Sequence, residues 1–268
     1  MRRSPVVAGQ FYPGSKTQWE QQVQAFLAQA DTPSRPARLA MVPHAGYPFS
    51  GPLAGQTLGA IDLPETLLLL GPNHTGLGAP LALWDKGAWD IPGASLPIQE
   101  PLAASILEHC PHIQADDTAH LREHSLEVIL PFLYVRQPRT RIVPLAVAEP
   151  HLPTLLETAG HLYTVLQQET QSVGLVVSSD MSHFISEARA KAQDDLALQH
   201  ILELNPEGLY NTVRANKISM CGVLPMTLGL QLAKLAGATQ TRLVGYTTSA
   251  EATGDRSQVV GYAGVIVE

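Results

Sequence analysis

The chain has 268 residues, of which 45% are hydrophobic and 15% charged, a composition typical of a globular protein with a large buried core. Its formal net charge of −7 and the lack of any Lys/Arg cluster exclude a basic surface for nucleic acid. Two cysteines cannot form a disulfide framework, and no apolar run approaches the ~20 residues of a membrane span. No apolar segment typical of a signal peptide follows the N-terminus, so we expect a cytoplasmic protein that binds neither nucleic acid nor membranes.

Short apolar runs alternate along the chain with longer amphipathic stretches. The runs that predict strands are, in chain order, residues 38–43, 66–70, 141–148, 173–179, 241–249 and 259–267. The stretches that predict helices are residues 17–30, 123–135, 152–168, 185–204 and 222–237. Strands that are apolar throughout indicate burial on both faces. The sequence therefore predicts one α/β domain over residues 1–268, a three-layer α/β/α sandwich with a largely parallel or mixed central sheet.

Three of the predicted strands end in a polar motif that contains histidine. The motif "HAGYPFSG" presents His44, "GPNHTGLG" presents His74, and "DMSHF" presents Asp180 and His183. Each histidine alone is typical of a hydrogen-bonded loop. Ligand sites of open α/β sheets lie beyond the carboxyl ends of the strands, so three such ends together predict one shared crevice. Asp180 is expected either to cap a helix whose first turn contains His183 or to pair with His183 as an acid–base group.

Two further motifs have both a structural and a functional interpretation. In "REHSLEVILPF", the spacing of His124 and Glu127 favours the solvated first turn of a helix. In "MCGVLPM", Cys221 at a predicted helix start is either a buried apolar residue or a thiol whose thiolate the helix N-terminus favours, and which could bind a soft metal. Residues 108–120 are rich in His, Cys and Asp. We interpret them as a polar surface loop rather than a zinc clip, because their spacing matches no zinc motif.

The chain contains "AGQFYP", "PHAGYPFSG", "GPNHTG", "EHSLEVILPFL", "VVSSDMSHF", "MCG" and "TTSAEATGDRSQVVGYA" in this order. This ordered set, which extends over nearly the whole chain, resembles the Memo family, whose prokaryotic members are called AmmeMemoRadiSam system protein B. That family is similar in fold to the class III extradiol dioxygenases, which hold Fe(II) with two histidines and a carboxylate.

The resemblance implies a transition-metal site in which His44 and His74 are ligands and Cys221 takes the place of the dioxygenase carboxylate. It implies Fe(II) as the metal, with copper or zinc as alternatives. It assigns an acid–base role to His183, with Asp180 beside it. The residues expected to line the substrate pocket are Tyr47, Phe49, His124, Glu127 and Phe184.

Two functions from different classes fit these expectations. The first is an iron- or copper-dependent redox enzyme related to the extradiol dioxygenases, with a small-molecule substrate. The second is a non-enzymatic module that binds a peptide or partner protein, with a structural or sensing metal. The family name links that second function to a radical-SAM protein. The exchange of a carboxylate for a thiolate leaves both functions open.

Overall fold

Nine strands form the central sheet of the computed structural model, which describes residues 1–268. Their order is β12 (His183–Ile185), β14 (Val259–Val267), β3 (Leu39–Val42), β11 (Val173–Ser178), β5 (Thr66–Pro72), β10 (Arg141–Val147), β6 (Leu81–Leu83) and β9 (Gln114–Ala115), while β13 (Thr241–Thr248) pairs with β14. The four central strands β3, β11, β5 and β10 are parallel, whereas β14 and β6 run antiparallel to their neighbours. These four are almost completely buried, which confirms the prediction of strands covered on both faces.

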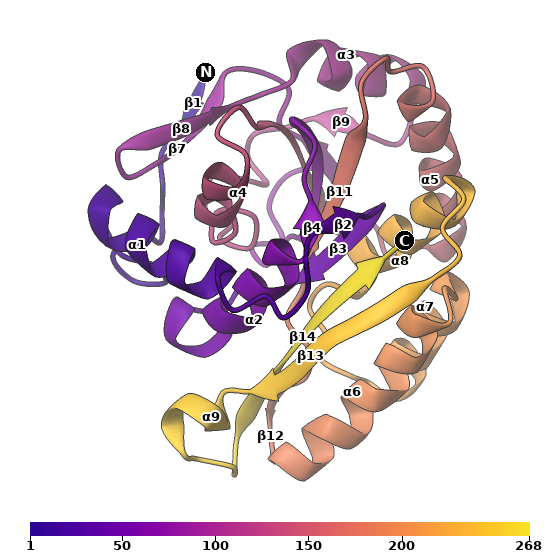
Figure 1. Cartoon of the computed structure of the whole chain (residues 1–268). Coiled ribbons are helices and arrows are strands. Elements are labelled where there is room, and N and C mark those ends of the chain that lie inside the picture. The colour runs from indigo at the N-terminus through magenta and orange to yellow at the C-terminus, as the bar shows by residue number, and fades with distance from the viewer.

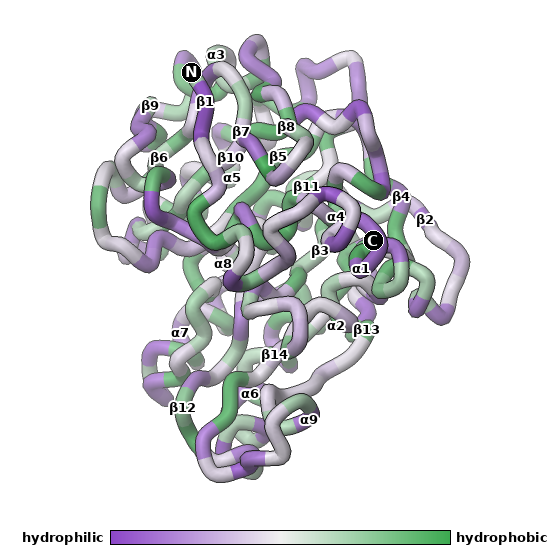
Figure 2. The backbone as a smooth tube through the Cα atoms, turned by 90° about the vertical axis from the view of Figure 1, so that its left-hand side faces the viewer, coloured by the Kyte–Doolittle hydropathy of each residue, from purple (hydrophilic) through white to green (hydrophobic).

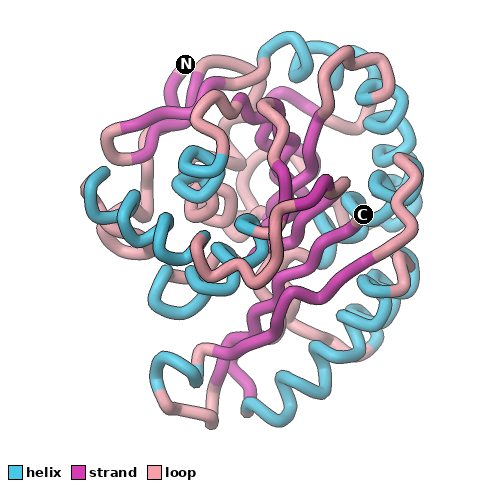
Figure 3. Tube along the Cα trace, in the orientation of Figure 1, coloured by secondary structure: helices cyan, strands magenta, loops and turns pink.

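Helices cover both faces of this sheet, and the predicted three-layer sandwich is confirmed (Figure 1, Figure 3). One layer consists of α1 (Lys16–Leu27), α2 (Tyr47–Gly59) and α4 (Leu130–Arg136). The other contains α3 (Glu100–His109), α5 (Leu152–Leu166), α6 (Glu187–Leu202), α7 (Pro206–Ala215) and α8 (Val223–Leu235), and a short α9 (Ala250–Thr253) follows β13. The hydropathy colouring of Figure 2 places apolar segments along the inner strands. No helix is long and apolar enough to cross a membrane.

Two small sheets lie outside the main one. The first consists of β1 (Arg2–Arg3), β7 (Ala88–Ile91) and β8 (Ala94–Pro97), and the second of β2 (Arg35–Pro36) and β4 (Ile61–Asp62). These short strands, together with β6, β9 and β12, are absent from the sequence-based prediction. Two to four residues are too few to produce a recognisable hydrophobic period.

Helices α2, α3 and α7 are also absent from that prediction, and α2 shows why. Its sequence contains three glycines and two prolines, which normally indicate a loop. A Cβ atom on Gly55 would lie 2.5 Å from the backbone carbonyl carbon of Phe26, at the end of α1. The glycine is therefore required by the close approach of two helices.

The predicted helix over residues 123–135 is wrong in its first half. Helix α4 begins only at Leu130, and turns precede it. The expected solvated turn is wrong as well, because Glu123 and Glu127 are buried. The Glu123 carboxylate accepts a hydrogen bond from the Ser125 N–H, which stabilises a turn instead of a helix.

The helix expected to contain His183 in its first turn begins later than predicted. His183 belongs to β12, and α6 begins at Glu187. Asp180 does not cap a helix. Its Oδ1 accepts a hydrogen bond from the backbone N–H of His44 at 2.8 Å, so a contact between two strand ends replaces the local cap.

A buried ion pair attaches the N-terminal segment to the loop before α4. Arg3 Nη1 lies 2.8 Å from Glu127 Oε2, and both side chains are almost fully buried. Glu127 also accepts hydrogen bonds from the N–H groups of Val6 and Val7, and Arg3 donates to the carbonyl of His120. His120 is fully buried and Cys110 almost fully buried. Residues 108–120 are therefore not the uniform polar surface loop that we predicted.

Candidate metal centre

The candidate site lies where three neighbouring parallel strands end. β11 lies between β3 and β5, and the register places Ser178 opposite Val42 and Val177 opposite Leu70. His44 and His74 each follow two residues after the end of their strands, β3 and β5. The apolar strands thus fix the positions from which both histidines enter one site, as their placement in the sequence predicted.

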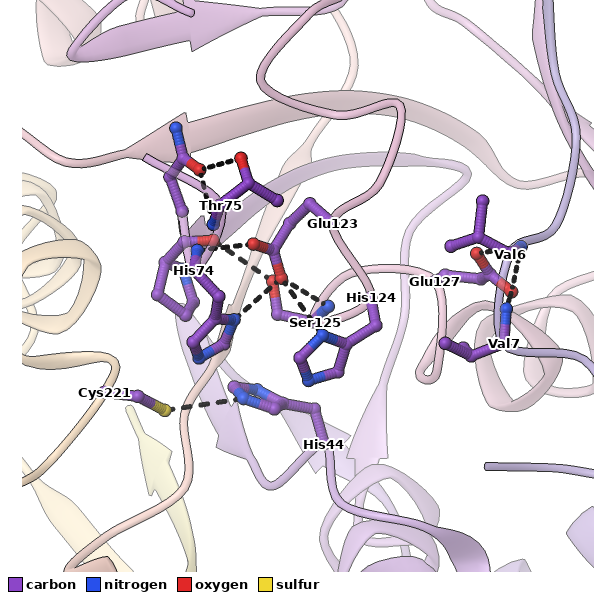
Figure 4. A network of polar contacts seen from close by, with 12 residues as sticks. Val6, Val7, His44, His74, Thr75, Glu123, His124, Ser125, Glu127 and Cys221 are labelled. Carbon is purple, nitrogen blue, oxygen red and sulfur yellow. Dashed lines mark hydrogen bonds and ion pairs between the residues drawn. The ribbon is translucent and has the colours of Figure 1, made fainter. Parts of the chain in front are cut away.

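His44, His74 and Cys221 each present one ligand atom, and these atoms all lie within 4.8 Å of one another. His44 Nε2 is 3.4 Å from Cys221 Sγ, and the two imidazole rings meet edge to face with centroids 5.4 Å apart (Figure 4). Two imidazoles and a thiol are a donor set that binds zinc, copper or iron. The three residues that the resemblance implied as ligands are therefore brought together by the fold.

Cys221 reaches the histidines through a tight contact between the start of α8 and the end of β11. A Cβ atom on Gly222 would lie 2.3 Å from Ser179 Oγ, so only glycine allows this approach. The Gly222 N–H donates to Ser179 Oγ at 3.2 Å, and the Asp180 N–H donates to Cys221 Sγ at 3.2 Å. The "CG" pair is the only local sign of this contact in the sequence.

Hydrogen bonds fix both imidazoles in the tautomer that a metal requires. Ser178 Oγ donates to the carbonyl of Ser125 at 2.7 Å, so it accepts from His44 Nδ1–H, also at 2.7 Å. His74 Nδ1–H donates to Glu123 Oε1 at 2.8 Å. Each ring therefore carries its lone pair on Nε2, which in His44 faces the Cys221 thiol, and the acceptors behind the rings orient them as in known metal sites. Sequence reasoning did not identify Ser178 or Ser125.

The charges around the two histidines differ. Complete burial lowers the pKa of His44 well below its ordinary value, and the nearby His124 and His74 lower it further. Burial opposes the charged forms of His74 and Glu123 as well, but their mutual hydrogen bond and attraction prevail. As a result the pKa of His74 is raised and that of Glu123 is lowered to about 2. His44 is therefore neutral near pH 7, and Glu123 remains a carboxylate behind His74.

The Cys221 thiol is protonated in the metal-free protein. Burial raises its pKa well above the ordinary value, and the charge of Asp180 raises it further. Burial likewise raises the pKa of the Asp180 carboxyl, despite the hydrogen bond from His44. Of the two interpretations of Cys221, the buried thiol therefore describes the metal-free state, because desolvation favours the neutral form.

His183 and His124 complete the group of imidazoles. The backbone N–H of His183 donates to Ser219 Oγ at 2.8 Å, and its Nδ1–H donates to the carbonyl of Ser219 at 2.9 Å. No hydrogen bond involves its Nε2, and its ring lies close enough to interact with both His44 and Asp180. The ring of His124 stacks on that of His74, with centroids 4.8 Å apart and planes inclined by 19°.

The other residues expected to line a substrate pocket take different places. Tyr47 is buried, and its hydroxyl donates to the carbonyl of Val128. Glu127 faces the N-terminal segment, away from His44, His74 and Cys221 (Figure 4). Phe49 and Phe184 are surface residues, 38% and 72% exposed. Phe11, which the prediction of pocket residues omits, lies against His124 with ring centroids 5.0 Å apart.

Comparison with known proteins identifies the family. The family model "Memo-like protein" matches residues 3–266. The chain is 38% identical to a MEMO1 family protein of Aquifex aeolicus over 98% of both chains, and 37% identical to one of Methanopyrus kandleri over 99% of both. A crystal structure of an uncharacterized protein from Escherichia coli K12 has a TM-score of 0.58 over 85% of this chain and 98% of that one. At 12% identity this likeness concerns the fold alone. The chain belongs to the Memo family.

Proposed function

We propose that this protein is a metal-dependent oxidoreductase that holds iron or copper with His44, His74 and Cys221 and acts on a phenolic substrate. The observation that carries the proposal is the convergence of two free Nε2 atoms and one thiol, with a fixed acceptor behind each imidazole. Such preorganisation costs stability in a metal-free protein, because it holds polar groups together and buries one of them, His44.

The residues present fit a transition-metal ion. Imidazole and thiolate ligands suit iron, copper and zinc, and the thiolate makes the site softer than a two-histidine, one-carboxylate site. Binding must release the thiol proton of Cys221, because only the thiolate is a ligand. When bound, iron or copper supplies the electron-transfer chemistry that protein side chains lack.

His183 is the proposed general base. Its Nδ1–H is held by the carbonyl of Ser219, which leaves Nε2 as an acceptor and stabilises the imidazolium that forms. In this role Nε2 takes the proton of a substrate hydroxyl group. The aromatic rings of Phe11 and His124, which lie against each other, form an apolar wall suited to a phenolic ring.

A second candidate function is the binding of a partner protein or peptide, and Phe184 favours it. This residue directly follows His183, has a positive φ of 58° and exposes 72% of its surface. A bulky residue in the left-handed region is strained, and such strain is concentrated at functional sites. An exposed aromatic beside His183, the proposed general base, suits an apolar side chain of a larger ligand.

The experiment is metal analysis of protein purified without oxygen, followed by oxygen-uptake assays with a panel of catechols and other phenols. The proposal expects stoichiometric iron or copper, and uptake that requires both metal and substrate. Bound zinc with activity that persists without oxygen would instead indicate a hydrolase. Metal binding without any uptake, together with capture of a peptide, would support the second function.

A further inference from the structure

The outer edge of β13 has no strand beside it. β13 is hydrogen-bonded to β14 along one side only. The free side of an edge strand presents N–H and C=O groups that pair readily with another extended segment, unless the edge is protected. β13 is eight residues long, contains neither lysine nor proline, and runs uncovered in the foreground of Figure 1. It is therefore open to pairing.

A hollow lies on each face of β13. The hollow on the α6 side, of about 420 Å³, is lined by Glu187 and Lys191. The hollow on the α2 side, of about 380 Å³, is lined by Phe49 and Leu53. Glu251, just beyond the end of β13, lines both hollows. Successive side chains of an added strand point to opposite faces, so they would enter the two hollows alternately.

A β-bulge restricts how a strand can pair with this edge. The register with β14 shifts between Leu243 and Gly245, which limits the regular part of β13 to residues 245–248. Two copies related by a two-fold axis would pair this part antiparallel, with the axis at Tyr246 or Thr247. With the extra residue of the bulge counted, either centre places Arg242 of one copy near the end of β13 in the other, where α9 begins and Glu251 lies.

Arg242 and Glu251 have complementary charges and no partners within the chain. The ion pairs of this region are Lys191 with Asp195 at 3.3 Å and Arg256 with Glu187 at 3.1 Å, and neither includes Arg242 or Glu251. Because a two-fold axis repeats every contact, each dimer would contain two Arg242–Glu251 pairs. This reciprocity favours a second copy of the chain over a foreign strand.

We propose that β13 is a self-association edge, at which two copies of this protein pair their β13 strands antiparallel and form reciprocal Arg242–Glu251 ion pairs. The two sheets then become one continuous sheet. The proposal does not depend on the metal or on the proposed activity.

Sedimentation velocity of the full chain over increasing micromolar concentrations tests it. We expect the wild type to change from monomer to dimer. Arg242→Glu and Glu251→Arg should each weaken the association about tenfold, because each places two like-charge contacts in the dimer. The double variant should recover the wild-type association. Arg35→Glu, which makes the same charge change at an exposed position of β2, should have no effect.

Two results would overturn the proposal. One is a wild type that remains monomeric at every concentration. The other is a dimer whose association neither responds to the single charge reversals nor recovers in the double variant. Circular dichroism of each variant shows whether it is folded. Amide hydrogen exchange gives a second measure, because protection of residues 245–248 should increase with protein concentration.

Discussion

His44 Nε2 and Cys221 Sγ lie 3.4 Å apart although 177 positions separate the two residues in the sequence. His44 follows β3, whereas Cys221 precedes α8, and the close contact of Gly222 with Ser179 brings them together. In the proposed site, a metal ion held by both residues would take the place of this direct contact. The following predictions concern the groups that hold this arrangement in place.

Glu123→Gln should reduce metal affinity by about 10- to 100-fold, because the amide no longer provides the negative charge behind His74. Glu127→Gln, on the same loop, is the matched control. It removes the charged partner of the buried Arg3, so it should lower the free energy of unfolding by roughly 3–5 kcal/mol. The affinity for the metal should not change. Zinc titration calorimetry and urea unfolding of both variants separate the two effects. A similar loss of metal affinity in both would contradict this assignment.

The juxtaposition of His44 and His74 at two strand ends could be predicted from the sequence, but the groups that support them could not. His44 and His74 follow apolar runs that indicate buried parallel strands, so their juxtaposition follows from topology alone. Cys221 comes from a helix start, and only the family resemblance indicated it. The acceptors Ser178 and Glu123 depend on how a loop packs against β5, where a Cβ atom on Gly71 would lie 2.9 Å from Ser125 Oγ. No local pattern encodes such a contact.

The errors in the secondary structure have a similar origin. Residues 123–129 have a helical pattern, but the long-range hydrogen bonds of Glu123 with His74 and of Glu127 with Val6 favour turns. Asp180 has the chemistry of a helix cap, yet the backbone of His44 is its actual partner. In each case a long-range hydrogen bond outweighs a local preference of at most about 1–2 kcal/mol.

His183→Ala should retain the metal and lose turnover. In the proposed site His183 is not a metal ligand, and its Nε2 accepts the substrate proton. Metal analysis and oxygen uptake should be measured on the same preparation. His151→Ala, at a histidine whose side chain is 78% exposed, is the control. A large drop in metal occupancy in His183→Ala would make His183 a ligand.

The metal-free protein should lose stability between pH 6.5 and about 4, in part through His120. Burial lowers the pKa of His120 to about 4, although its hydrogen bond to the carbonyl of Ala82 opposes the shift. The unfolded chain therefore binds a proton that the folded chain excludes in this range, and stability falls as the pH falls. The contribution of His120 is roughly 3 kcal/mol when fully developed.

The test is urea unfolding of wild type and His120→Gln at pH 7 and pH 4.5. The difference in unfolding free energy between the two pH values should be smaller in the variant, because His44 still contributes and His120 no longer does. If the unfolding free energy depends on pH equally in both proteins, the fold does not suppress protonation of His120.

Phe184→Asn should raise the free energy of unfolding by about 1 kcal/mol and reduce turnover or partner binding. Asparagine tolerates the left-handed backbone that strains phenylalanine, and the exposed ring contributes little burial. Lys217→Asn is the matched control, because Lys217 has a φ of 53° at a position outside the site. It should be stabilised to a similar extent with unchanged function. Loss of function in both variants, or in neither, would remove Phe184 from the site.

The most direct test of the metal centre is native mass spectrometry of protein reconstituted with Fe(II) or Zn(II) under anaerobic conditions. The wild type should carry one ion per chain. His44→Ala and His74→Ala should carry none while remaining folded, and Cys221→Ser should bind weakly, without the rise in affinity with pH that release of a thiol proton gives the wild type. Full occupancy in all three variants would contradict the proposed site.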